Sequence, residues 1–86
     1  MEFTSSKYFQ KKFNKLSFKL QNQVAKRLEL FRINQFHPLL KNHQLHGEFK
    51  DLRSINITAD VRLLYEKISN NVYKLSDIGT HSELYG

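Results

Sequence analysis

A group of polar residues in the second half of the chain has side chains that can do chemistry. They are His43, His46, Asp60, Arg62, His81 and Tyr85. Histidine exchanges protons near neutral pH, and arginine stays charged and can bind a phosphate group through two nitrogens. Cleavage of RNA by its own 2′-hydroxyl needs a group that takes the hydroxyl proton, another that protonates the leaving 5′-oxygen, and a cation beside the phosphorane. This set of side chains can supply all of them.

The same residues have simpler structural interpretations, which the sequence leaves open. Asp60 could cap a turn between two strands, and Arg62 could pair with Glu66 along one strand. Tyr85 could be a packing residue that closes the core. Histidines in loops, such as His37, are more often simply exposed to solvent.

Most of the histidines fall within one short segment, at positions 37, 43 and 46. Their spacing matches no common zinc-ligand pattern, and the chain has no cysteine that could complete one. RNA cleavage by the 2′-hydroxyl requires only proton transfer and charge stabilisation. We therefore expect neither a metal nor an organic cofactor.

The composition fits one small folded domain over residues 1–86. Of the 86 residues, 40% are hydrophobic and 26% are charged, and this length leaves no room for a second domain. The absence of cysteine excludes disulfides and thiolate nucleophiles. No apolar run approaches the ~20 residues of a membrane span, and the N-terminus lacks an apolar signal core, so we expect a cytosolic protein.

The net charge of +6 is concentrated in the first half of the chain. Residues 1–46 hold nine Lys/Arg and two acidic residues, whereas residues 47–86 hold five and six. A basic half favours a polyanion or an acidic protein as partner, although a small domain also needs net charge for solubility. The candidate RNA-contacting residues are Lys11, Lys12, Lys15, Lys19, Lys26, Arg27, His46 and Arg53.

The first part of the chain has helical periodicity. Its apolar residues recur at spacings of three and four, in the order Phe9, Phe13, Leu16, Leu20, Val24, Leu28 and Phe31. One helix of this length would be ~40 Å long, which is too long for so small a core. We therefore predict a helical hairpin broken near residues 14–17, where helix propensity is weak. A short strand or an extended lead-in at residues 1–4 precedes it, and residues 4–6 offer capping hydroxyls.

The hydrophobic pattern changes to a period of two in the second part of the chain. His37-Pro38 ends the helical region, and residues 37–47 are predicted to form a loop. Strands are predicted at residues 52–57, 61–68 and 72–78, with a tight turn at residues 69–71. Such short connections require antiparallel pairing. Gly79 is expected to break the last strand and leave a short tail. The predicted fold is α+β, with an N-terminal helical hairpin packed on one face of a small antiparallel sheet.

Four segments of the second half form a recognisable series. They are His43-Gln44-Leu45-His46-Gly47, Leu52-Arg53, Asp60-Val61-Arg62-Leu63-Leu64-Tyr65 and Gly79-Thr80-His81-Ser82-Glu83-Leu84-Tyr85. Together they resemble the RelE/YafQ family of toxins from bacterial type II toxin–antitoxin systems. The last segment is closest to the YafQ branch, whereas the Asp-x-Arg-Leu-x-Tyr pattern is common to the wider RelE/ParE superfamily.

This resemblance implies a ribosome-dependent endoribonuclease that enters the ribosomal A site and cuts the mRNA codon there. It also implies a small antitoxin protein that wraps the toxin and masks its cleft. By position, Asp60 or His43 is the expected general base and His81 the expected general acid. Arg62 is expected on the scissile phosphate, and Tyr85 is expected to stack on a base.

The chain departs from the YafQ pattern at three positions. Asn56 stands where the family has a further histidine, Asp77 where it has an arginine, and Val61 where it has a tryptophan. The first change removes a titratable group. The second places an anion where the family has a cation near the expected phosphate, which should weaken RNA binding. His46 is an extra histidine beside the motif, and it could compensate for these changes.

Two other functions remain compatible with the sequence. ParE-type inhibitors of gyrase share the fold of the superfamily without being nucleases, and the changes at Asn56 and Asp77 favour such a non-catalytic toxin. A plain nucleic-acid-binding domain would instead use the lysines of the helices, and its binding would depend steeply on salt.

Overall fold

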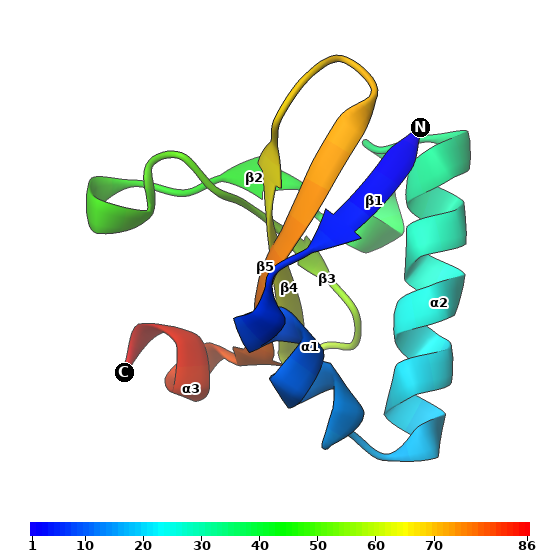
Figure 1. Ribbon diagram of the computed structural model, residues 1–86, viewed down its shortest axis with the longest axis vertical. Helices are drawn as coiled ribbons and strands as arrows, with labels where there is room; N and C mark the ends of the chain where they lie inside the picture. The colour runs from blue at the N-terminus through cyan, green and yellow to red at the C-terminus, as the bar shows by residue number, and fades with distance from the viewer.

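A single five-stranded sheet forms the centre of the molecule, in the order β1-β5-β4-β3-β2. The computed structural model describes all residues from Met1 to Gly86. Its elements are β1 (Glu2–Ser5), α1 (Lys7–Asn14), α2 (Phe18–Ile33), the 3₁₀ turn η1 (Pro38–Leu40), β2 (His43–Gln44), the 3₁₀ turn η2 (Gly47–Phe49), β3 (Arg53–Asn56), β4 (Val61–Lys67), β5 (Val72–Thr80) and α3 (His81–Tyr85). Figure 1 shows α2 on one side of the sheet and α3 on the other.

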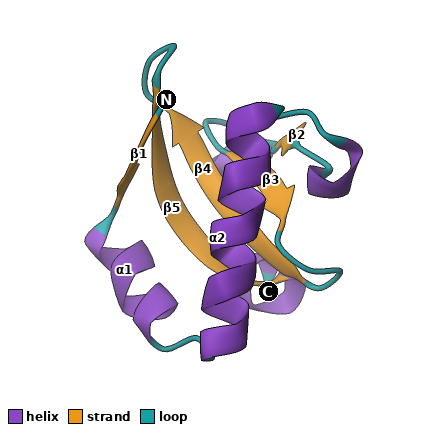
Figure 2. Cartoon of the chain, turned by 90° about the vertical axis from the view of Figure 1, so that its right-hand side faces the viewer, coloured by secondary structure: helices purple, strands orange, loops and turns teal.

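The hydrophobic core lies between the sheet and α2, which crosses the sheet in Figure 2. Its buried members are Phe9, Val24, Phe31, Leu40, Ile55, Ile57, Leu63, Tyr65, Tyr73, Leu75 and Ile78. The ring of Phe31 on α2 meets the rings of Tyr65 and Tyr73 edge-on, each with a centroid separation of 5.2 Å. Since this core occupies one face of the central strands, the residues that alternate with it are left for the other face.

The predicted break between the two helices is confirmed, but the helices do not form the expected hairpin. The Ser6 hydroxyl accepts a hydrogen bond from the backbone N–H of Phe9 at the start of α1, and Ser17 does the same for Leu20 at the start of α2. The short α1 packs on β5, whereas the longer α2 spans the sheet. Helix α2 ends at Ile33, before the proline that was expected to stop it. None of the helices combines the length and hydropathy required to cross a membrane.

The prediction of a wholly antiparallel sheet was wrong at one edge. Strand β1 pairs parallel with β5, from Glu2 opposite Val72 to Ser5 opposite Leu75. The pairs β3–β4 and β4–β5 are antiparallel, as predicted, and the unpredicted strand β2 also pairs antiparallel with β3. The rule that short connections force antiparallel pairing does not apply to β1, because most of the chain separates it from its partner.

The segments on either side of the last three strands are more regular than predicted. The expected loop at residues 37–47 contains η1 and the short strand β2. Gly79 does not break β5, which continues to Thr80, and Gly79 pairs with Arg62 of β4. The expected tail is the helix α3. A β-carbon at position 79 would lie 3.2 Å from Glu83 Oε1, so this glycine lets α3 pack closely against the end of the strand.

Candidate active site

A cavity of about 360 Å³ lies on the face of the sheet opposite α2. It is lined by His43, Leu45, Ser54, Arg62, His81 and Tyr85. Ile55 and Leu63 belong to the core beneath α2. Their neighbours Ser54 and Arg62 therefore face the other way, because successive residues of a strand alternate between the two faces. The cavity brings together side chains from β2, β3, β4 and α3.

His43 is held in a defined tautomer by the backbone. Its Nδ1 lies 2.8 Å from the carbonyl oxygen of Lys41. A carbonyl only accepts hydrogen bonds, so Nδ1 must be the protonated nitrogen and Nε2 carries the free lone pair of the neutral ring. Lys41 has a left-handed backbone conformation (φ 46°), which ends η1 just before β2. The exposed imidazole of His43 is therefore prepared to accept a proton at Nε2.

The residue before His43 is tied to the core by a hydrogen-bond network. The Asn42 side-chain amide donates to the Tyr65 hydroxyl at 2.8 Å and to the Gln35 carbonyl at 3.0 Å. Its carbonyl oxygen accepts from Arg53 Nε at 2.9 Å. Burial raises the pKa of the Tyr65 hydroxyl, although the hydrogen bond with Asn42 acts in the opposite direction. This network fixes the start of β2 relative to the sheet.

The Arg62 guanidinium borders the cavity without a carboxylate partner. Its Nη1 donates to the carbonyl oxygens of Ala59 at 2.7 Å and Thr58 at 3.4 Å in the turn before β4. Neither Asp60 nor Glu66 pairs with it, because the ion pairs of the chain lie elsewhere. Its positive charge is therefore not neutralised by an acid and can attract an anion into the cavity.

Asp60 is not among the residues that line the cavity. It is exposed in the turn between β3 and β4, where its backbone N–H donates to the Thr58 hydroxyl at 3.3 Å. Asp60 lies just outside β4, which begins at Val61, as predicted. The alternation of side chains along β4 therefore does not extend to Asp60.

Helix α3 presents His81 and Tyr85 one turn apart, with their ring centroids separated by 4.8 Å. The Thr80 hydroxyl accepts from the Glu83 N–H, and the Glu83 carboxylate accepts from the Thr80 N–H at 2.7 Å. This second hydrogen bond lowers the pKa of Glu83. The Thr-x-x-Glu spacing of such a capping box was visible in the sequence and could have revealed the helix.

Phe49 extends the aromatic surface beside the cavity, and the sequence analysis did not single it out. Its ring meets the Tyr85 ring edge-on with a centroid separation of 5.7 Å. Phe49 ends η2, far from Tyr85 in the chain. Phe49, Tyr85 and His81 thus form a row of half-buried and exposed rings on which a nucleobase could stack.

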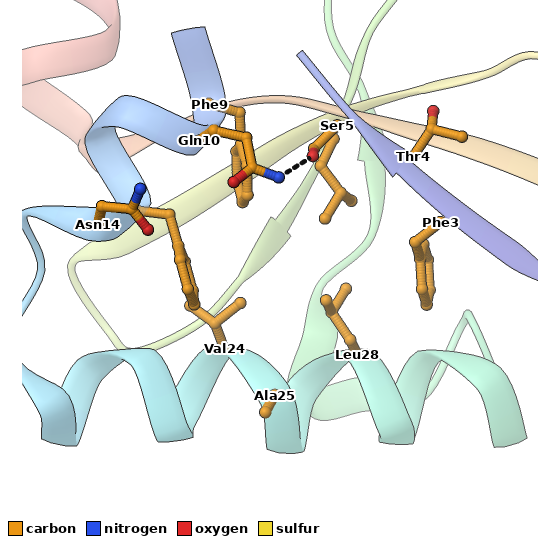
Figure 3. A pocket seen from close by; sticks show the side chains of 11 residues that line it. Phe3, Thr4, Ser5, Phe9, Gln10, Asn14, Val24, Ala25 and Leu28 are labelled. Atoms are coloured by element: carbon orange, nitrogen blue, oxygen red, sulfur yellow. Dashed lines mark hydrogen bonds between the residues drawn. The ribbon is translucent and has the colours of Figure 1, made fainter. Parts of the chain in front are cut away.

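A second hollow, of about 290 Å³, lies between β1, α1 and α2. Figure 3 shows Phe9, Val24 and Leu28 around it, with Gln10 donating to Ser5 Oγ at 2.7 Å. None of its lining residues is titratable. It therefore has no group for acid–base chemistry, and the cavity with the two imidazoles remains the candidate active site.

Comparison with known proteins identifies the family and supports the fold. A family model described as "Bacterial toxin of type II toxin-antitoxin system, YafQ" matches residues 1–86. The chain belongs to the YafQ toxin family. The resemblance to the RelE/YafQ toxins that the C-terminal motifs indicated is therefore confirmed. No curated protein sequence matches the chain.

Several solved structures are similar to this YafQ-family chain along its whole length. YafQ from E. coli strain BL21(DE3) is 26% identical, with a TM-score of 0.74 over 99% of this chain and 98% of that one. The toxin in the E. coli DinJ-YafQ toxin-antitoxin complex is 27% identical, with a TM-score of 0.71 over 99% and 97%. A metal-bound toxin from Helicobacter pylori is 31% identical, with a TM-score of 0.69 over 99% of each chain.

The cavity of this YafQ-family toxin does not have the donor set of a metal site, although that H. pylori relative is described as metal-bound. No three His, Asp or Glu side chains of this chain lie close enough together to share a metal ion. The two imidazoles of the cavity instead have the Arg62 cation beside them, which disfavours a second positive charge. The cavity therefore offers side chains for acid–base chemistry rather than a ligand set for a metal ion.

The three departures from the YafQ pattern have distinct surroundings. Asp77 forms an ion pair of 2.6 Å with Lys12 of α1. Asn56 lies opposite Arg62 in the β3–β4 ladder but does not line the cavity. Val61 packs against the edge of the core. The acid at position 77 is therefore already neutralised by a partner within the toxin.

The basic residues proposed from the sequence to contact RNA do not form one surface. Lys11, Lys15, Lys19, Lys26 and His46 are exposed. Lys12 pairs with Asp77, Arg27 donates to the Leu39 carbonyl at 3.0 Å, and Arg53 belongs to the Asn42 network. The basic residues of α2 lie on the side of the sheet away from the cavity. Lys12 and Lys15 instead share a small hollow with Gly79 of β5 and Glu83 of α3.

Proposed function

We propose that this YafQ-family toxin is an endoribonuclease that cuts mRNA on the ribosome through attack of a 2′-hydroxyl on the adjacent phosphodiester. The observation that carries the proposal is the convergence of His43, Arg62, His81 and Tyr85 on one cavity. Two imidazoles and a guanidinium without an acidic partner are the groups that this reaction needs. The family to which the chain belongs supports the same conclusion.

In the proposed reaction, His43 Nε2 accepts the proton of the 2′-hydroxyl. The 2′-oxygen forms a bond to phosphorus while the bond from phosphorus to the 5′-oxygen breaks. His81, as an imidazolium, donates its proton to that 5′-oxygen. Arg62 donates to the non-bridging oxygens and stabilises the added charge of the phosphorane. The products are a 2′,3′-cyclic phosphate and a 5′-hydroxyl, and the rate has a bell-shaped dependence on pH.

His43 rather than Asp60 is the proposed general base. The Lys41 carbonyl leaves Nε2 of His43 as the accepting atom, whereas Asp60 is exposed outside the cavity lining. Replacing His43 with Gln should lower kcat by roughly 10²–10⁴-fold, the usual contribution of a general base. Asp60→Asn should retain most of the activity, and the reverse order of effects would assign the proton transfer to Asp60.

The aromatic row beside the cavity is the proposed binding site for a base of the codon. Tyr85 is flanked by the rings of His81 and Phe49. Stacking on such rings contributes about 1–3 kcal/mol per base. Phe49→Ala and Tyr85→Ala should therefore weaken substrate binding more than they lower the rate of the bound complex.

We also propose that an antitoxin protein binds this toxin and blocks the cavity. A relative has been solved as the DinJ-YafQ toxin-antitoxin complex, and the net charge of +6 suits an acidic partner. If the gene beside this one encodes a small acidic protein, coexpression of that protein should suppress toxicity. Toxicity that is unchanged by coexpression would exclude it as the antitoxin.

The decisive experiment expresses the toxin and maps the ends of one reporter mRNA with and without a functional start codon. We expect growth arrest and cuts only in the translated mRNA, and His81→Ala should abolish both. His37→Asn is the matched control, because it removes a histidine that lies outside the cavity. In the wild type His37 Nδ1 accepts a hydrogen bond from the Leu39 N–H, and the asparagine side chain keeps an acceptor for it. Growth arrest by His81→Ala, with inhibited DNA supercoiling, would instead support a non-catalytic toxin.

A further inference from the structure

Ser54 is a buried residue of the cavity wall whose hydroxyl has no hydrogen-bond partner. Its side chain is 0% exposed, and Oγ bonds to no other group of the protein. An unpaired buried hydroxyl destabilises the fold, and such groups are uncommon in native proteins. Packing alone does not explain a serine here, because alanine would fill nearly the same space without that cost.

The strand register places Ser54 directly beside the proposed base. Ser54 is opposite His43 in the β2–β3 pair and opposite Leu64 in the β3–β4 pair. Directly opposite residues of antiparallel strands have β-carbons about 4.5–5.5 Å apart. His43 and Ser54 both line the cavity, so a phosphodiester bound there lies beside both residues.

The surroundings of Ser54 favour a phosphate oxygen as its partner. Leu45 and Leu64 are buried on the same side of the sheet, and a hydrogen bond to an anion is stronger among such apolar neighbours than in water. The Arg62 charge draws anions to the same cavity. A phosphodiester oxygen accepts hydrogen bonds and donates none, which suits a free hydroxyl donor.

We propose that the Ser54 hydroxyl donates a hydrogen bond to a non-bridging oxygen of the scissile phosphate, alongside Arg62. Ser54 is thus a substrate-binding residue that holds phosphorus in line with the 2′-oxygen activated by His43. This assignment rests on the proposed nuclease function. It adds a neutral donor to the pair of imidazoles and the guanidinium.

The test compares the wild type with Ser54→Ala, with Ser69→Ala in the exposed β4–β5 turn as the matched control. Cleavage is measured on ribosomes programmed with a defined mRNA, together with thermal unfolding. Ser54→Ala should melt at the same or a higher temperature, because it removes an unpaired hydroxyl. Its kcat/KM should nevertheless fall roughly ten- to a hundredfold, the value of a lost hydrogen bond to a charged group. The shape of its pH profile should not change, because both imidazoles remain.

The kcat/KM of Ser54→Cys should lie between those of the wild type and Ser54→Ala, because a thiol is similar in size to a hydroxyl and is a weaker donor. A Ser54→Ala protein with wild-type kcat/KM overturns the inference and leaves the nuclease function standing. A lowered melting temperature also overturns it, since Ser54 then has a structural role. If the wild type itself leaves ribosome-bound mRNA intact, the nuclease function fails, and the test becomes titration with inorganic phosphate followed by NMR. Weaker phosphate binding by Ser54→Ala then supports the contact, and equal binding overturns it.

Discussion

The ammonium of Lys12 lies 2.6 Å from Oδ1 of Asp77, which joins α1 to β5. The same ammonium lies 5.3 Å from the centroid of the Tyr8 ring. The family pattern has a cation at position 77. In this toxin the position is acidic, and the positive charge beside it comes from a different element. The ion pair therefore converts a site of expected RNA contact into a structural link.

We predict that this ion pair contributes measurably to stability. Both side chains are about one-quarter exposed, at 27% and 24%, so solvent screens the attraction only in part. A double-mutant cycle with Lys12→Met and Asp77→Asn, followed by urea unfolding, should give a coupling of about 0.5–1.5 kcal/mol. The same cycle on Arg32 and Glu29, which are 40% and 74% exposed, should give less. Equal couplings for the two pairs would contradict the prediction.

The capping box of α3 should weaken in acid. The hydrogen bond from the Thr80 N–H lowers the pKa of Glu83 from the ordinary value of 4.5. A carboxylate with a depressed folded-state pKa stabilises the fold above its unfolded pKa, and this contribution is lost as the pH falls through the folded pKa. NMR of the Thr80 amide should therefore show a transition below pH 4.5. Glu83→Gln should abolish that transition, and a persisting one would assign it to another group.

Gly79→Ala should affect activity more than stability. A β-carbon at position 79 would lie 3.3 Å from the Glu83 β-carbon and 3.4 Å from Lys12 Nζ. Glu83 of α3 must give by a few tenths of an ångström to accommodate it, and α3 also holds His81. Since the rate depends on the exact placement of catalytic groups, kcat should fall while the unfolding free energy falls by about 1–2 kcal/mol. Wild-type kcat would show that α3 tolerates the added methyl group.

The sequence predicted the elements with strong periodicity and the residues with distinctive chemistry. The helix break and the three antiparallel strands follow from local patterns, and the structure brings His81 of the final Gly-Thr-His motif into the same cavity as Arg62. The parallel β1 was not predictable, because its partner is distant in the chain. Asp60 precedes β4 by one residue, so the alternation of side chains along that strand did not determine whether Asp60 lines the cavity. Phe49 and Ser54 gained their importance only from tertiary packing, which no local pattern reports.

Asn42 should be a positioning residue for the proposed base. Its side chain links the start of β2 to Tyr65 and Arg53 in the sheet, and His43 follows it directly. Asn42→Ala should lower the unfolding free energy by about 1–3 kcal/mol, because the buried Tyr65 hydroxyl loses its partner. It should also lower kcat about tenfold or more, because the His43 ring is no longer held in place.

The double variant Asn42→Ala/Tyr65→Phe separates these two effects. It removes the buried hydroxyl that the single variant leaves unpaired, so part of the lost stability should return. The activity should not return, because nothing replaces the link between β2 and the sheet. Measuring kcat on programmed ribosomes beside urea unfolding for the wild type and the variants tests both statements. If kcat recovers together with stability, Asn42 acts only through the folding equilibrium, and the position of His43 does not depend on it.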